Sequence, residues 1–571
     1  MADRLASELL GIGATRVDLR LDAALGGHSV DPVHFEPCQS INYGGVLLLL
    51  PFLIANGLLS YQQYYSKRQS GYYDFDTTVL TLAFMYLCRI KTAEQLKHHS
   101  PGELGKLLGL DRVPEARCLR TIMKELYEQQ KSEEWNVNLS QKWIDQENTS
   151  IYYVDGHVQV YHGHLANLGK KHVSRQKLCL PGMIEFWVNN SEGMPYFFVT
   201  GQVNEKLQQT ISEEIVPELN TLTQSRITQK ELDLDPDLPR YTLTFDREGY
   251  SPEFFKDLWQ KHRVAVLTYR KNVKDLWDEA EFIDYEVETE LGKTTMKLHE
   301  KQLEINGFKM REIRKLSDDG HQTSVITTNR KLSITFVAKY MFARWTQENF
   351  FKYMRQEYDI DRIVQYGIDE LDNNIEVVNR EYSILTQGLK KNREKTARRQ
   401  AQLFLLQEEN AKSEKRQTSK NLLDQLKLRE EIERFKTEEQ ALISKRKLQP
   451  YKITIGQMPE PTRYNKLKTE SKHLQNIIKM ICYRAETSFA NLLAIHYKKK
   501  TNEIRALVKS IIFTKADLMP NYQDKTLTIT LYSLATNRDN TAIENIIQIL
   551  NDTETIFSGT DLTLIYKTAT I

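Results

Sequence analysis

Cysteine is scarce in this chain, and the five that occur are scattered through its 571 residues. No two of them are spaced as CxxC, which argues against a zinc ribbon or a dithiol redox motif. Disulfides are rare in the reducing cytoplasm, so a sparse and odd cysteine count predicts a cytoplasmic protein.

Long apolar runs and a signal sequence are lacking as well. The most apolar stretch, residues 46–55, is too short to span a bilayer and contains Pro51. We therefore expect a buried helix there. The N-terminus has no basic region followed by an apolar core, so no secretory signal and no membrane partner are predicted.

Neither sign of charge is in excess, because 78 basic residues face 76 acidic ones and leave a net charge of +2. This balance neither shows nor excludes a nucleic-acid partner, since local basic patches matter more than the total. The chain is long enough to form several domains.

The order of apolar patterns predicts an α/β protein built from six segments. Within the second segment the expected order is β-β-β-α-β-α-β. The segments are residues 1–149 (helical), 150–274 (strands and helices), 275–335 (a β-rich insertion), 336–368 (a closing helix), 369–450 (a long, coiled-coil-like helical segment) and 451–571 (a small mixed α/β region).

Carboxylates stand at unusual places in the strands of this second segment. Asp155 interrupts the predicted strand 151–160, and Asp246 ends the predicted strand 241–246. Burying an unpaired charge is costly, and a shared divalent metal would be a reason to do so. Oxygen ligands suit Mg²⁺ and Mn²⁺, and two such ions can clamp the reacting oxygens of a phosphodiester.

A third carboxylate, Glu348, lies on the predicted closing helix. It belongs to a series spaced by four, four, four and three residues, which places the series on one helical face. The series is Tyr340, Arg344, Glu348, Lys352 and Arg355. An acid flanked by Arg and Lys suits a metal site with phosphate-binding groups. A solvent-exposed helix with i,i+4 ion pairs has the same pattern, so the two aspartates carry the interpretation.

These motifs resemble those of DDE transposases of bacterial insertion sequences, in the branch with a β-rich insertion before the last acidic residue. The matching residues are Tyr-Val-Asp155-Gly-His-Val, Phe-Asp246-Arg-Glu-Gly-Tyr and the helix from Tyr340 to Arg355. The resemblance covers roughly residues 40–370 and implies a ribonuclease-H-like core. The gap from Tyr340 to Arg344 is one residue longer than the commonest form of the family's signature, and Arg355 stands where lysine is usual.

The resemblance also implies a reaction: metal-dependent DNA cleavage and strand transfer of an insertion sequence. Asp155, Asp246 and Glu348 would be catalytic and hold two Mg²⁺ ions, for which Mn²⁺ would substitute. Tyr340, Arg344 and Arg355 would support them, with the arginines on DNA phosphates. Partners would be double-stranded DNA (element ends and target) and a second copy in a synaptic homodimer, in the bacterial cytoplasm at the nucleoid.

Two basic clusters are candidate DNA contacts. The first is a loop between predicted strands and consists of Lys170, Lys171, Arg175 and Lys177. The second lies in residues 101–130, where a helix, a tight turn at 110–114 and a second helix resemble a helix-turn-helix carrying Arg112, Arg117, Arg120 and Lys124. A solvated turn and an ordinary helical hairpin remain alternatives.

Residues 369–448 are rich in charge and nearly lack glycine. Apolar residues at Ile375, Val378, Tyr382, Leu385 and Leu389 have a 3-4-3-4 spacing, which predicts a long helix or helical hairpin. Three other functions therefore stay open. They are an inactive transposase-derived DNA-binding or scaffold protein, a coiled-coil interaction protein, and a nuclease that cuts without joining.

Overall fold

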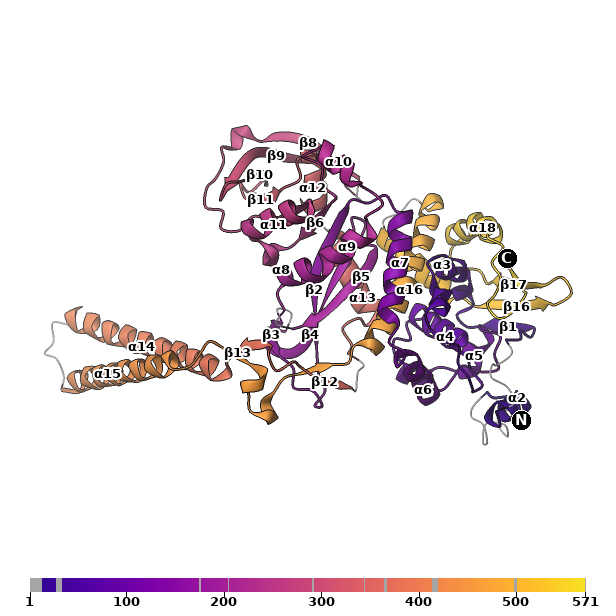
Figure 1. Cartoon of the computed structure of the whole chain (residues 1–571), viewed down its shortest axis with the longest axis horizontal. Coiled ribbons are helices and arrows are strands. Elements are labelled where there is room, and N and C mark those ends of the chain that lie inside the picture. The colour runs from indigo at the N-terminus through magenta and orange to yellow at the C-terminus, as the bar shows by residue number, and fades with distance from the viewer. Residues whose placement is uncertain are drawn as a thin grey trace. The chain divides into compact units, whose positions relative to one another are not determined.

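A mixed sheet in the middle of the sequence organises the fold of this mixed α/β protein (Figure 1). The computed structural model describes residues 13–26, 33–173, 176–203, 205–289, 292–342, 345–363, 367–412, 419–497 and 501–569. The chain divides into two compact units. The first is Met1–His162, Gly169–Gln365 and Lys468–Ile571, and the second is Gly163–Leu168 with Tyr366–Leu467.

Five strands form the centre of the sheet, in the order β5-β4-β2-β6-β7. They are β2 (Ile151–Val160), β4 (Leu178–Asn190), β5 (Pro195–Gln202), β6 (Tyr241–Phe245) and β7 (Val264–Tyr269). β2, β4 and β5 are antiparallel neighbours, whereas β6 runs parallel to β2 and β7 parallel to β6. The predicted order of elements is confirmed, with the additional short strand β3 (Lys170–Val173) beside β4.

Local sequence explains these elements. β6 and β7 are short apolar runs that are buried almost throughout, as expected for parallel strands covered on both faces. Between them, α11 (Pro252–His262) begins where the Ser251 hydroxyl accepts from the backbone N–H of Phe254, and it has proline at its first position. It buries Phe255 and Leu258.

The β-rich segment extends this same sheet. Its strands are β8 (Ile283–Thr289), β9 (Gly292–Ile305), β10 (Phe308–Leu316) and β11 (Gln322–Thr327), and β11 pairs antiparallel with β7. Two helices follow, α12 (Ile334–Phe342) and α13 (Trp345–Tyr358). The closing helix was predicted for this stretch, although residues 343–344 lie outside the described residues.

The two ends of the chain fold together. The short strand β1 (Cys38–Ile41) pairs with β16 (Ala516–Asn521), and β17 (Thr526–Leu531) and β18 (Thr563–Thr568) complete that sheet. The long helix α16 (Glu470–His496) packs against α3 (Leu50–Ala55), α4 (Phe75–Leu87) and α7 (Ser132–Gln146). β1 and β16 were not predicted.

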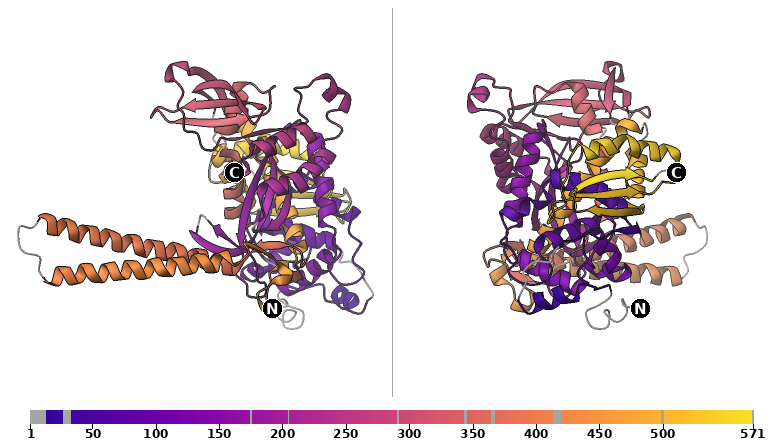
Figure 2. Two further views of the ribbon diagram at one scale, coloured as in Figure 1. Left: turned by 60° about the vertical axis from the view of Figure 1, so that its left-hand side comes forward. Right: turned by 90° about the vertical axis from the view of Figure 1, so that its right-hand side faces the viewer.

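The second unit contains an antiparallel helical hairpin, α14 (Arg380–Lys412) and α15 (Ser419–Lys447), which Figure 2 shows side by side. Leu389, Ile432 and Phe435 are buried in it, and Arg393 pairs with Glu439 at 2.7 Å. The predicted seam began too early. Val378 lies in strand β13 (Glu376–Val378), which pairs with β14 (Lys452–Thr454), so it and Ile375 precede the helix.

The apolar stretch at residues 46–55 is helical and largely buried, as expected. It forms a 3-10 turn at Gly44–Leu49 followed by α3. Among the described residues, none of the helices combines the length and apolar character that crossing a membrane requires.

Candidate carboxylate site

Asp155 and Asp246 lie next to each other on adjacent strands. The parallel register of β2 and β6 pairs Ile151 with Thr242 and ends with Val154 beside Phe245. The next residue on each strand is an aspartate, and neighbouring strands are about 4.8 Å apart. Asp155 is half-buried and its Oδ1 accepts from the N–H of Gly156 at 2.9 Å, whereas Asp246 is exposed. Two of the three predicted carboxylates therefore lie on neighbouring chain segments where β6 ends.

Helices α12 and α13, the second of which carries Glu348, contact the face of the sheet that bears Asp155. Tyr153, Asp155 and His157 share this face because alternate strand residues point the same way. The Tyr153 hydroxyl donates to the Tyr340 carbonyl at 2.8 Å, and the His157 ring stacks on Phe351 with centroids 4.9 Å apart. Asp155 lies between Tyr153 and His157 along β2. Glu348 belongs to α13, three residues before Phe351, but its side chain lies outside the described residues.

The other predicted residues of this helix have different surroundings. Arg344 lies outside the described residues. Tyr340 is half-buried and stacks on Phe336 with centroids 5.9 Å apart, and burial raises the pKa of its phenol. Arg355 donates through Nε to the Phe351 carbonyl at 3.1 Å, and its terminal nitrogens have no hydrogen-bond partner among the residues described.

The donor set suits a hard divalent cation. Aspartate oxygens are the ligands that Mg²⁺ and Mn²⁺ prefer, and two adjacent carboxylates without a cation between them would repel each other. Within the part of the chain that the structure describes, no group of three or more His, Cys, Asp or Glu side chains is arranged to hold a metal ion. The Glu348 side chain is not in that part, so the described set is two of the three predicted ligands.

One basic residue of the predicted DNA-contact loop lies near Asp246. Lys171 on β3 pairs with Glu248, two residues after Asp246, at 3.3 Å. Lys170 and Lys177 are exposed, and Lys177 has a left-handed backbone (φ 53°) at the turn into β4. Arg175 lies outside the described residues. Of the described residues of this loop, Lys171 is the one that a contact places near Asp246. Lys177 precedes by ten residues Trp187, the cross-strand partner of Asp155 on β4.

The second basic cluster lacks the spacing of a helix-turn-helix. Residues 107–115 separate α5 (Pro101–Lys106) from α6 (Ala116–Tyr127), whereas that motif has a turn of about three or four residues. Arg112 is buried and pairs with Glu115 at 2.6 Å, so it is not available to DNA. Arg117 and Arg120 are exposed on α6, and Arg120 pairs with Glu94. Without Arg112, the cluster consists of exposed basic residues on α6.

Sequence analysis missed a buried polar network under the same face of the sheet. Glu185, the cross-strand neighbour of His157, accepts from Asn476 at 2.8 Å and from Gln159 at 2.6 Å. On α16, Lys472 donates to the Ile360 carbonyl at 2.5 Å and Lys479 to that of Asp359 at 3.4 Å. Two lysines thus hold the backbone that follows α13. The sequence did not predict that Lys472 and Lys479 are buried, because lysine is almost always exposed.

Replacing Lys479 by methionine is expected to stabilise the protein near neutral pH. Burial, together with the charge of Lys472, lowers the pKa of Lys479 from 10.5 to about 7. Between these values the unfolded chain binds a proton that the folded chain does not. The free energy of unfolding therefore rises with pH in this window, and the full cost applies below it. At about 1.4 kcal/mol per pKa unit, that cost is a few kcal/mol.

The effect is measured by thermal unfolding of the parent protein and of Lys479→Met, first just below neutral pH and then at a pH close to 10. The gain in Tm should be several degrees just below neutral pH and small at a pH close to 10. Lys567→Met, at an exposed position on β18, is the control and should show no such dependence. A gain that is independent of pH would contradict the expectation.

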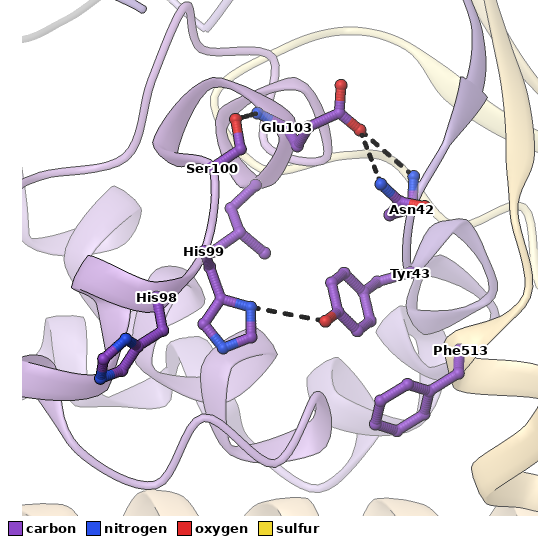
Figure 3. Close-up of a pocket in the computed structure, with 8 residues that line it drawn as sticks. Asn42, Tyr43, His98, His99, Ser100, Glu103 and Phe513 are labelled. Carbon is purple, nitrogen blue, oxygen red and sulfur yellow. Dashed lines mark hydrogen bonds between the residues drawn. The ribbon is translucent and has the colours of Figure 1, made fainter. Parts of the chain in front are cut away.

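A separate hollow of about 420 Å³ lies among the helices near the N-terminus (Figure 3). Its lining is Asn42, Tyr43, His98, His99, Ser100, Glu103, Leu104 and Phe513. His99 Nδ1 is 3.4 Å from the Tyr43 hydroxyl, and Asn42 donates to Glu103 at 3.3 Å. Burial lowers the pKa of His99. None of the predicted site residues lies in this hollow.

Comparison with known proteins identifies a family for nearly the whole chain. A family model described as "Transposase protein" matches residues 11–570. No curated protein matches the sequence. The match covers the central sheet, both ends of the chain and the helical hairpin alike.

Proposed function

The chain belongs to this family of transposase proteins, and from that premise we propose that it cuts and joins DNA with the carboxylates Asp155, Asp246 and Glu348. Membership makes the chain a DNA-processing enzyme. The finer proposal is a DDE transposase with a ribonuclease-H-like core that moves an insertion sequence.

One observation carries this proposal: two aspartates stand side by side on the two central parallel strands. Numbered in chain order without β3, the five central strands lie in the order 3-2-1-4-5, with the second antiparallel to its neighbours. This strand order supports the proposed ribonuclease-H-like core. Ligands of open α/β sheets bind at the carboxyl ends of parallel strands where the strand order reverses, and Asp155 and Asp246 stand on the strands on either side of that point.

The chain's own residues would perform distinct tasks. Asp155 is half-buried and Asp246 is exposed at the end of β6. Both would present oxygens to the cation from one side, and Glu348 would close the site from α13. When bound, two Mg²⁺ ions would activate the attacking hydroxyl and stabilise the leaving oxygen. Because Asp246 begins an exposed turn, a DNA phosphate can approach its side of the pair without rearrangement of the strand.

Positive side chains of β3, the turn after it, α13 and α6 would hold the DNA backbone. Lys170 and Lys171 lie on β3 and Lys177 on the turn into β4, and among the described residues the terminal nitrogens of Arg355 on α13 have no hydrogen-bond partner. Arg117 and Arg120 on α6 would supply a further contact. Phosphate contacts give affinity and position without reading sequence. The proposed partners remain double-stranded DNA and a second copy of the chain, in the bacterial cytoplasm at the nucleoid.

The experiment that tests the proposal uses the purified full chain, Mg²⁺ or Mn²⁺, and plasmid DNA carrying the genomic sequences that flank its gene. A transposase should release the flanked segment and join its 3′ ends to a target plasmid. Products that are cut but never joined would identify a nuclease of the same fold. The absence of both cutting and joining with either metal would overturn the proposal and favour the scaffold alternative.

A further inference from the structure

The carboxyl-terminal end of α13 enters a cluster of buried charges. Arg89, which follows the C-cap residue of α4, lies with its Nε 2.8 Å from Glu357 Oε2 and with its Nη2 2.6 Å from Glu486 Oε1. Its Nη2 also donates to the Tyr353 hydroxyl at 3.1 Å, and that hydroxyl donates to Glu486 at 2.9 Å. We call these four residues, two on α13, one after α4 and one on α16, the anchor cluster.

Helix α17 (Thr501–Phe513) adds further charge to the anchor cluster. Lys509 Nζ lies 3.0 Å from Glu357 Oε2, and the Arg505 guanidinium lies over the Tyr353 ring at 4.8 Å. Burial alone would raise the pKa of Glu357, but the hydrogen bond from Lys509 and the charge of Arg89 hold it below its ordinary value. Glu357 is therefore a carboxylate at neutral pH.

This arrangement suits a role in positioning more than in stability. The side chains of Arg89 and Glu486 are 8% and 0% exposed, and burying such a pair costs desolvation that offsets much of its attraction. Arg89 also has a left-handed backbone (φ 65°), a conformation that glycine would adopt at less cost. What the cluster provides is a single defined placement of α13 against helices from both ends of the chain.

That placement reaches Glu348 through the helix itself. Glu348 precedes Glu357 by nine residues, which is about 13 Å along a helix axis at ~1.5 Å per residue. Between them, Phe351 stacks on His157, two residues from Asp155. A shift of α13 at the anchor cluster would therefore move Glu348 relative to the aspartates.

We propose that Arg89 is a positioning residue of the carboxylate site: by holding Glu357 and Tyr353 it fixes α13 and so the place of Glu348. The proposal rests on the proposed function, because it assumes that Glu348 completes the site. A displacement of about 1 Å caused by a change far from the chemistry can cost about 100-fold in rate.

The test compares Arg89→Met and Arg89→Lys with the parent protein, at a temperature well below every Tm. For Arg89→Met, the Mn²⁺ concentration that gives half-maximal plasmid cleavage should rise about tenfold, and the rate at saturating Mn²⁺ should fall about 100-fold. Arg89→Lys, which keeps the charge, should recover part of both.

Arg20→Met is the matched control. Arg20 is also a nearly buried arginine between a carboxylate and tyrosines, with Nη2 2.5 Å from Asp111 and its guanidinium 3.9 Å from the centre of the Tyr72 ring. Among the described residues, Arg20 has no contact with α13. This variant should lose thermal stability as Arg89→Met does, with an unchanged half-saturating Mn²⁺ concentration.

Glu357→Gln, which keeps the shape of the α13 side chain, gives a second test if Arg89→Met does not fold. It should also raise the half-saturating Mn²⁺ concentration. If the parent cuts DNA and the folded variants lose only Tm, as the control does, Arg89 is structural and the inference is wrong while the proposed function stands. A parent that does not cut would overturn the proposed function and this inference with it.

Discussion

Replacing Asp246 by alanine is expected to lower metal-dependent DNA cleavage by about 10³-fold or more and to leave the fold intact. A metal-held phosphodiester reaction gains several kcal/mol of transition-state stabilisation from its ions, and about 1.4 kcal/mol corresponds to tenfold in rate. Asp246 is exposed and lies beyond the last paired residue of β6. Its removal therefore costs little packing and relieves repulsion from Asp155, so Tm without metal should not fall.

Two measurements separate this expectation from simple unfolding. The first is nicking of supercoiled plasmid with Mn²⁺, beside the surface variant Asp257→Asn on α11, which should cut like the parent. The second is the rise in Tm on adding Mn²⁺, because a ligand that binds only the folded state stabilises it. That rise should disappear in Asp246→Ala. A variant that cuts as fast as the parent would remove Asp246 from the site.

The neighbouring aspartates could be anticipated because each signal is local. A period-two apolar pattern identifies β2, a short buried run identifies β6, and Asp155 and Asp246 stand at the positions where those patterns are interrupted or end. Only the register, Val154 beside Phe245, had to come from the structure. The role of Glu348 stays a prediction, because helical spacing shows which residues share a face but not what that face meets.

Burial of charged residues could not be foreseen. Arg112 and the exposed arginines of α6 look alike in sequence, yet Arg112 is buried against Glu115. Arg89 and Glu486 are 397 residues apart in the sequence. A pair formed at that distance along the chain leaves no periodic pattern, so the anchor cluster had no signal that sequence reasoning could use.

The pairing of the two chain ends could not be predicted from the sequence for the same reason. This pairing leads to the second large expected effect. A chain truncated after Leu467 should fail to fold its N-terminal helices. β1 would lose its partner β16, and the Tyr566 hydroxyl would no longer donate to the Leu47 carbonyl, a bond of 3.1 Å. α16 alone buries apolar residues such as Ile477, Ile481 and Phe489 at 1% exposure or less. Each such side chain contributes about 1.5–3 kcal/mol, against a total stability of about 5–15 kcal/mol.

The control for this truncation removes a long segment from the other compact unit. Joining Asn379 to Leu448 by a short Gly-Ser linker deletes α14 and α15, while β13 and β14 keep their pairing and the Asn379 N–H still reaches the Tyr451 carbonyl at 2.9 Å. Thermal unfolding followed by circular dichroism should show a cooperative transition for the hairpin deletion and none for the truncated chain. Residues 468–571 supplied as a separate chain should restore that transition, because the two ends form one core. If the truncated chain melts cooperatively by itself, the N-terminal helices have a core of their own and the C-terminal segment only covers it.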